Sequence, residues 1–202
     1  MYIGDTGDGS GLHRMLFEVV DNAISEALAG HCSRIEVALN AGGSATVRDN
    51  GRGIPTDIHP REGISAAEYI MTHLTWAEEF PQGTRKMPDA FPAGIGLAVV
   101  NALSEQLDLH IWRNGKEHFM RYRMGKPDAP IAVVGTAHQP DGNLRRGTEI
   151  TFLPSSKIFT KTEFDFTTIE HRLRGLAYLD VGVVIALSDR RGIQSKEIVL
   201  DL

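Results

Sequence analysis

The chain has 202 residues, of which 42% are hydrophobic and 23% are charged, and this composition excludes a disordered or fibrous protein. Its 21 lysines and arginines against 26 aspartates and glutamates give a net charge of −5, which excludes a domain that binds nucleic acid by positive charge alone. A single cysteine, Cys32, excludes an internal disulfide framework. Because the sequence shows neither a long apolar run nor a signal peptide, we expect a cytoplasmic protein without a membrane partner.

The hydrophobic pattern predicts four helices and eight strands. In chain order they are helix 12–29, strands 34–39 and 45–48, helices 66–75 and 94–104, the hairpin of strands 107–113 and 116–123, strands 131–135 and 148–153, helix 164–179, and strands 183–188 and 197–200. Asn114-Gly115 in the hairpin favours a type I′ turn. With no linker between these elements, we expect one α+β domain over residues 1–202, a mostly antiparallel sheet with helices on one face.

The first candidate site is the polar face of helix 12–29. Glu18 and Asn22 are four residues apart and therefore lie one turn apart on one face, with Asp21 beside them. A carboxylate there can deprotonate a water, and an amide oxygen is a hard ligand that suits Mg²⁺. Taken alone, the pattern is more typical of the solvated face of an amphipathic helix.

Two further candidates are glycine-rich. Asp49 comes at the end of a predicted strand, before Asn50-Gly51-Arg52-Gly53, where glycines let the backbone approach a ligand. The carboxylate could accept a hydrogen bond from an exocyclic amine such as that of adenine, although the segment alone could be an ordinary turn.

Gly94-Ile95-Gly96 begins a predicted helix whose free N–H groups can bind phosphate. A lone Gly-x-Gly is a weak signal, and the chain has neither a P-loop nor a complete dinucleotide-binding fingerprint.

Two more features complete the pattern. Gly147-Thr148 enters a predicted strand, although taken alone it is more typical of an ordinary turn. We expect residues 76–93 to form a long irregular loop with three prolines, a length typical of a functional lid or of a disordered segment. The chain thus carries an acidic helix, a strand-end aspartate with glycines, a lid-length loop, a glycine helix start and a Gly-Thr strand, in that order. An adenine-nucleotide site with a lid needs these parts.

These stretches resemble the N-terminal ATPase domain of the B-type subunits of bacterial type IIA topoisomerases, a family that includes the B-type subunits of gyrase and topoisomerase IV. The resemblance runs through nearly the whole chain and is carried by MYIGDTGDGSGLHRMLFEVVDNAISEALAGHC at 1–32, VRDNGRGIPTDIHPREGISAAEYIMT at 47–72 and GIGLAVVNALSEQL at 94–107. It implies a two-layer α/β sandwich, the Bergerat-type fold, with ATP and Mg²⁺ as cofactors.

The resemblance also implies a role for each matching residue. Glu18 would be the general base that activates the water attacking the γ-phosphate, and Asn22 would bind Mg²⁺ and phosphate. Asp49 would accept a hydrogen bond from the adenine amino group, with a bridging water shared by Gly53 and Thr148. The other implied ATP-binding residues are Gly51, Ile54, Pro55, Ile70, Met71, Gly94, Ile95, Gly96 and Leu97.

At the mouth of the implied pocket, Glu26 and Arg52 are placed for an ion pair. Arg113 in the hairpin matches the arginine that aminocoumarin inhibitors contact in this family. These three residues would form the pocket rim.

The lid, at about 76–96, departs from the family pattern. Where the family reads close to AGGKF and then GGLHGVG, this chain has WAEEF at 76–80 and AFPAGIG at 90–96. The change removes a lysine and several glycines whose backbone N–H groups could surround phosphates, and Glu78 and Glu79 would repel a triphosphate. We therefore expect an intact adenine pocket and an altered phosphate site.

The family's N-terminal dimerisation arm and its transducer domain have no counterpart in these 202 residues. We expect the fragment to bind nucleotide as a monomer with little hydrolysis. In the whole enzyme, ATP binding and hydrolysis would drive DNA strand passage, with a second copy of this chain, the DNA-cleaving A-type subunit and DNA as partners. The sequence does not separate gyrase from topoisomerase IV.

The alternative is a degenerate nucleotide-binding regulatory module of the same fold that does not hydrolyse ATP, an interpretation that the altered lid favours. A chaperone or kinase relative is disfavoured, because the GRGIPTDIHP and VVNALSE stretches point to topoisomerases.

Overall fold

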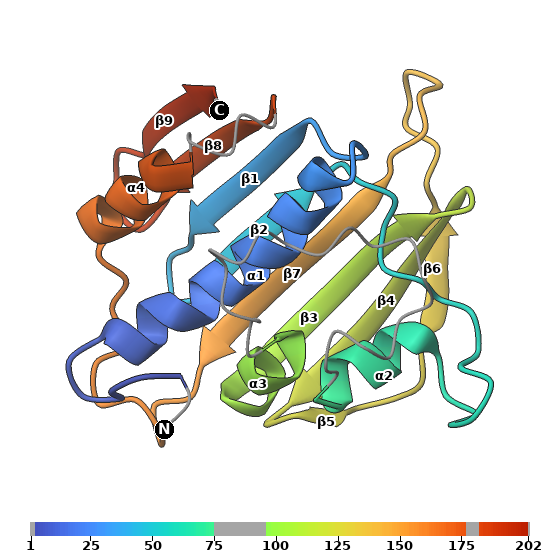
Figure 1. Ribbon diagram of the computed structural model, residues 1–202, viewed down its shortest axis with the longest axis horizontal. Coiled ribbons are helices and arrows are strands. Elements are labelled where there is room, and N and C mark those ends of the chain that lie inside the picture. Colours follow the sequence, from blue (N-terminus) through green and yellow to red (C-terminus); the bar gives the residue numbers. More distant parts are fainter. Residues whose placement is uncertain (1–2, 75–95, 177–181, 202) are drawn as a thin grey trace.

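A computed structural model of the chain describes residues 3–74, 96–176 and 182–201. The helices are α1 (Ser10–Leu28), α2 (Ala66–Thr72), α3 (Leu97–Ala102) and α4 (Phe166–Arg174). The strands are β1 (Arg34–Leu39), β2 (Ala45–Asp49), β3 (Ser104–Arg113), β4 (Lys116–Arg123), β5 (Lys126–Pro127), β6 (Ala132–Thr136), β7 (Gly147–Pro154), β8 (Val184–Asp189) and β9 (Lys196–Asp201). Figure 1 shows these helices lying over one face of the sheet, which confirms the predicted two-layer α+β architecture.

The sheet contains nine strands in the described residues, in the order β5-β4-β3-β7-β2-β1-β8-β9, with β6 paired to β4. Of these pairs, β1 and β8 run parallel and the others run antiparallel, so the sheet is mixed as expected. Strand β3 shows why one face is covered. Its Leu107, Leu109 and Ile111 are fully buried in the core, whereas the alternating Asp108 and His110 keep part of their surface exposed.

Helix α1 lies across the middle of the sheet and contacts β1, β2, β7 and α3 (Figure 1). The apolar stripe predicted from the sequence is buried against the sheet: Leu16, Val19, Val20, Ala23 and Ala27 are each at most 4% exposed. On another side of the helix, Glu18 accepts a hydrogen bond from the N–H of Gly96, the residue before α3.

Several element boundaries differ from the prediction, for local reasons. The helix expected over 94–104 ends at Ala102, because strand β3 already begins at Ser104, three residues before its predicted start. Helix α4 begins at Phe166 rather than 164, since the Asp165 side chain caps it by accepting from the Thr168 N–H at 2.6 Å. Strand β5 was not predicted, because two residues carry no periodicity.

Other predicted features lie outside the described residues. These are the lid at 76–93 and the end of the helix predicted to reach residue 179. None of the helices in the described part of the chain is both long and apolar enough to cross a membrane.

A close approach of two strands positions the site. Gly147, at the start of β7, has φ +113°, and a Cβ atom built on it would overlap the carbonyl oxygen of Asp49 at the end of β2. Glycine alone fits here, because any side chain would push the two strand ends apart. The absence of a side chain at Gly147 therefore brings Thr148 next to Asp49.

We expect Gly147→Ala to lower the free energy of unfolding by about 2–4 kcal/mol, because the added methyl group meets backbone atoms that cannot move aside. Chemical denaturation measures this directly. Gly175→Ala is the matched control, since Gly175 has φ −63° and no atom within 4 Å of the added Cβ. The control should change stability by less than about 1 kcal/mol, and equal losses in the two variants would contradict the close approach.

Candidate functional site

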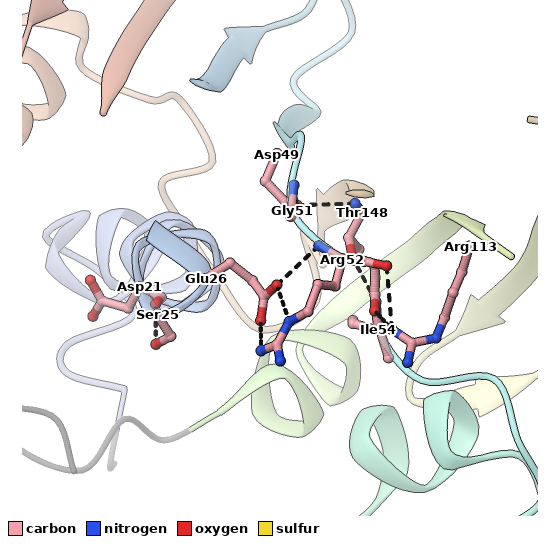
Figure 2. Close-up of polar contacts among 10 residues, drawn as sticks. Asp21, Ser25, Glu26, Asp49, Gly51, Arg52, Ile54, Arg113 and Thr148 are labelled. Carbon is pink, nitrogen blue, oxygen red and sulfur yellow. Dashed lines mark hydrogen bonds and ion pairs between the residues drawn. The ribbon is translucent and has the colours of Figure 1, made fainter. Parts of the chain in front are cut away.

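The centre of the candidate site is a buried carboxylate at the end of β2. Asp49 is 4% exposed, and its Oδ1 accepts hydrogen bonds from the backbone N–H of Gly51 at 2.8 Å and of Thr148 at 3.3 Å (Figure 2). Its Oδ2 accepts no hydrogen bond from the residues that the structure describes. Burial raises the pKa of Asp49 to about 6, although the bonds from Gly51 and Thr148 act to lower it. One oxygen is thus fixed by the backbone and the other is available to a ligand.

The surroundings of Gly51 and Gly53, which follow Asp49, leave little room for a side chain. A Cβ atom on Gly51 would lie 2.9 Å from both Asp49 Oδ1 and Glu26 Oε2. Gly53 has φ +78°, and its Cβ atom would lie 3.0 Å from the carbonyl oxygen of Trp112. These glycines therefore allow a close approach of the backbone to neighbouring protein groups; their approach to a ligand stays a prediction.

Thr148 connects Asp49 to the turn that follows it. Its Oγ1 accepts a hydrogen bond from the Ile54 N–H at 3.1 Å, and the residue is 4% exposed. Because this oxygen is already an acceptor, the hydroxyl proton remains available for a further partner. Gly147, which makes this contact possible, was noted in the sequence only as part of the Gly-Thr start of a strand; its close approach to Asp49 was not predicted.

The predicted rim residues are brought together. Arg52 binds the Glu26 carboxylate through Nη2 at 2.8 Å, Nε at 3.1 Å and its backbone N–H at 3.0 Å (Figure 2). Burial would raise the pKa of Glu26, but the bonds with Arg52 outweigh it and lower that pKa. Arg113 donates from Nη1 to the carbonyl oxygens of Gly53 at 2.8 Å and of Arg52 at 3.3 Å. The rim thus ties α1 and β3 to the glycine turn.

The second part of the site lies farther toward the N-terminus of α1. Glu18 is 3% exposed; its Oε1 accepts from Arg14 Nε at 2.7 Å and its Oε2 accepts from the Gly96 N–H at 3.2 Å. Asn22, one turn later, is half-buried, and its side chain makes no hydrogen bond to a described residue. Arg14 was missed as a site residue, although its four-residue spacing from Glu18 could have revealed it.

Asp21 does not join this group. Figure 2 shows Asp21 and Ser25 on the opposite side of α1 from Glu26. Burial and, to a smaller extent, the nearby charge of Glu18 raise the pKa of Asp21 to about 6, although Arg172 and Arg14 act to lower it.

The apolar residues predicted to bind ATP differ in how deeply they are buried. Ile54 and Leu97 are 7% and 5% exposed, Met71 is fully buried in the core, Ile70 is half-buried and Pro55 is exposed. Their part in a base pocket stays a prediction. Gly94 and Ile95 lie outside the described residues, whereas Gly96 is described and contacts Glu18.

The described residues contain no group of three or more histidines, cysteines, aspartates or glutamates that could hold a metal ion. Asn22 could supply one oxygen to a Mg²⁺ ion whose other ligands are phosphates and water.

We expect Asp21→Asn to stabilise the protein at neutral pH. The folded-state pKa of about 6 exceeds the ordinary 3.8, so the folded state binds this proton more tightly, and stability falls as pH rises from about 4 to about 6. The variant should therefore gain about 2–3 kcal/mol over the parent at pH 8 and little at pH 3, as measured by denaturation at both values. A gain that is the same at both values would contradict the buried position of this carboxylate.

Comparisons with known proteins identify the family to which the chain belongs. A family model described as "Histidine kinase-, DNA gyrase B-, and HSP90-like ATPase" matches residues 7–158. The chain is 57% identical over 198 residues to the B-type subunit of DNA gyrase from Rickettsia felis, and the match covers 98% of this chain and 24% of that protein. It is 52% identical over 202 residues to the B-type subunit of DNA gyrase from Caulobacter vibrioides, covering 98% and 25%.

A solved structure extends the likeness to the fold. The crystal structure of the 43K ATPase domain of Thermus thermophilus gyrase B in complex with an aminocoumarin matches with a TM-score of 0.82 and 42% sequence identity, covering 100% of this chain and 49% of that chain. The chain spans about a quarter of the length of the curated relatives that it matches. The chain therefore belongs to the histidine kinase-, DNA gyrase B- and HSP90-like ATPase family, and within it resembles the ATPase domain of gyrase B.

Proposed function

We propose that the chain binds ATP through Asp49 and hydrolyses it with Glu18 as the general base. The observation that carries this proposal is that the two oxygens of the buried Asp49 carboxylate differ. Oδ1 accepts hydrogen bonds from two backbone N–H groups, whereas Oδ2 is available to accept one from a ligand. An acceptor held in this way suits the exocyclic amine of adenine. The Thr148 hydroxyl, with its proton available beside it, could bind a water that also contacts the base.

The spacing along α1 supports the position of the phosphates. Glu26, Asn22 and Glu18 follow one another at four-residue steps, so they share one face, and Glu18 lies about 12 Å along the axis from Glu26. Glu26 is held next to the glycine turn through Arg52. A nucleotide whose adenine binds Asp49 would therefore extend its phosphates past Asn22 toward Glu18.

The hydrolytic step needs a carboxylate near the terminal phosphate. Glu18 would take a proton from a water while the water oxygen attacks the γ-phosphorus, and the bond to the bridging oxygen would break to release ADP and phosphate. When bound, Mg²⁺ supplies positive charge that stabilises the phosphate oxygens. Asn22 would hold this ion together with the phosphates, since its side chain is not engaged by a described residue.

For the whole protein, we propose a gyrase-type DNA topoisomerase in which ATP binding and hydrolysis drive DNA strand passage in the cytoplasm. The gyrase relatives favour gyrase over topoisomerase IV. The partners would be a second copy of this chain, the DNA-cleaving A-type subunit and DNA. The fragment alone would be monomeric and hydrolyse ATP slowly, and Arg113 would contact an aminocoumarin, the ligand class present in the Thermus thermophilus structure.

A second candidate function is a regulatory module that binds adenine nucleotides without hydrolysing them. The acidic residues Glu78 and Glu79, where the family has a glycine-rich lid, favour it. Besides hydrolysis itself, the two candidates differ in nucleotide binding: only the first predicts that the γ-phosphate and Mg²⁺ strengthen it.

We expect Asp49→Asn to reduce the affinity for ADP and for a non-hydrolysable ATP analogue by roughly 100-fold, because the new amide would direct an N–H group at the adenine amine. Asparagine keeps the shape of the side chain and an oxygen for Gly51 and Thr148, so the fold should be retained. Calorimetric titration with and without Mg²⁺ measures the effect.

The control for this titration is Asp108→Asn, a carboxylate that Arg121 binds at 2.7 Å through both Nε and Nη2, and that alternates with the core residues of β3. The control should bind as tightly as the parent. Unchanged affinity in Asp49→Asn would overturn the placement of adenine. Binding of ADP that neither the γ-phosphate nor Mg²⁺ improves would favour the regulatory module instead.

A further inference from the structure

The face of the sheet that the helices do not cover contains one buried aromatic side chain. From Leu107 to Ile111, core residues of β3 alternate with partly exposed ones, as expected for a strand with one covered face. Trp112, which follows Ile111, is therefore on the uncovered face, yet it is only 2% exposed. Other side chains on that same face must bury its indole ring.

Arg145 covers that ring. Its Cζ lies 3.4 Å from the centroid of the Trp112 ring, whereas the Cζ of Arg48 and the ring centroid of His110 each lie 5.7 Å from it. A planar guanidinium that stacks on an indole face gains a cation–π interaction. Arg145 Nε is buried without a hydrogen-bond partner among the described residues, and Nη2 reaches Glu149 Oε2 only at 3.4 Å. The stack on Trp112, more than the long bond to Glu149, therefore fixes the Arg145 side chain.

The position of Arg145 in the chain connects this stack to the candidate site. Arg145 is two residues before Gly147, and the pairing of β3 with β7 ends at the Trp112–Gly147 pair. Because Gly147 has no side chain to pack against Trp112, Arg145 makes that contact from just outside the strand. The residue after Gly147, Thr148, donates its N–H to Asp49 Oδ1 at 3.3 Å. Residues 145–148 thus join Trp112 on one face of the sheet to Asp49 on the other.

We propose that Arg145 is a positioning residue for adenine-nucleotide binding, which holds the start of β7 against β3 so that the Thr148 N–H stays bonded to Asp49. This inference rests on the proposed function of Asp49. It assigns Arg145 an effect on nucleotide affinity and none on the hydrolytic step. The reason is that its stack lies on the face of the sheet opposite α1, the helix that carries Glu18.

Two other contacts supply matched controls. Lys196 on β9 has its Nζ 4.0 Å from the centroid of the Phe166 ring, so Lys196→Gln removes a comparable cation–π contact from another part of the sheet. Glu149→Gln weakens the ion pair with Arg145 but leaves the stack on Trp112 in place. Partly exposed ion pairs contribute little. Neither control should therefore alter nucleotide affinity.

The test measures ADP affinity by calorimetry and steady-state ATP hydrolysis in the full-length protein with DNA present. We expect Arg145→Ala to weaken ADP binding roughly 5- to 20-fold and to raise KM for ATP by a similar factor, with kcat changed less than about twofold. The retained kcat also shows that the variant is folded. Arg145→Lys should lose almost as much affinity, because an ammonium group keeps the charge without the plane that stacks on the indole.

A double-mutant cycle tests the stack itself. Trp112→Leu removes the ring, so adding Arg145→Ala to that variant should change ADP affinity less than about twofold. If Trp112→Leu does not fold, Trp112→Phe takes its place. The effect of Arg145→Ala should then be smaller than in the parent, because a phenyl ring is a weaker cation–π partner than an indole.

Three results would overturn the inference. Unchanged ADP affinity in Arg145→Ala removes the positioning role. A parallel loss of affinity and kcat makes Arg145 a residue of general structural importance, and additive effects in the cycle show that the stack does not act on the site. Failure of the proposed function looks different: Asp49→Asn then binds ADP as tightly as the parent. Failure of the inference alone leaves Asp49→Asn weakened and Arg145→Ala unchanged.

Discussion

The hydrogen bonds from the Gly51 and Thr148 N–H groups to one oxygen of Asp49 join the parts on which the site depends. They connect the end of β2, the glycine turn after it and the start of β7, which are separated by almost 100 residues in the chain. The contact exists because Gly147 has no side chain to hold the strands apart. Without it, Asp49 Oδ1 would keep only the bond from Gly51, and Ile54 would lose its partner in Thr148.

Helix α1 relates this centre to the rest of the site. Its apolar stripe is buried against the sheet, so the face that carries Glu18, Asn22 and Glu26 is held at a set distance from Asp49. The Glu26–Arg52 pair ties the C-terminal part of this face to the glycine turn. The Glu18–Gly96 contact ties its N-terminal part to α3. A rigid helix therefore places a base-binding region and a phosphate-facing carboxylate on one scaffold, as a site for an extended ligand requires.

Local patterns account for what the sequence could predict. Helical spacing paired Glu18 with Asn22, and a strand followed by glycines marked Asp49, because both signals act over a few residues. Long-range contacts were not predictable in this way: the parallel pairing of β1 with β8 joins Arg34 to Val184, and the approach of Gly147 to Asp49 leaves no periodic trace. Arg14 was a different kind of omission: its four-residue spacing from Glu18 was visible in the sequence, but the burial of the Glu18 carboxylate was not.

A crystal structure of the chain with Mg²⁺ and a non-hydrolysable ATP analogue would test the proposed site most directly. We expect the adenine amine to bind Asp49 Oδ2, and the phosphates to run along α1 past Asn22 to Glu18, with the Arg14–Glu18 contact intact. An adenine bound away from Asp49, or phosphates directed away from α1, would contradict it.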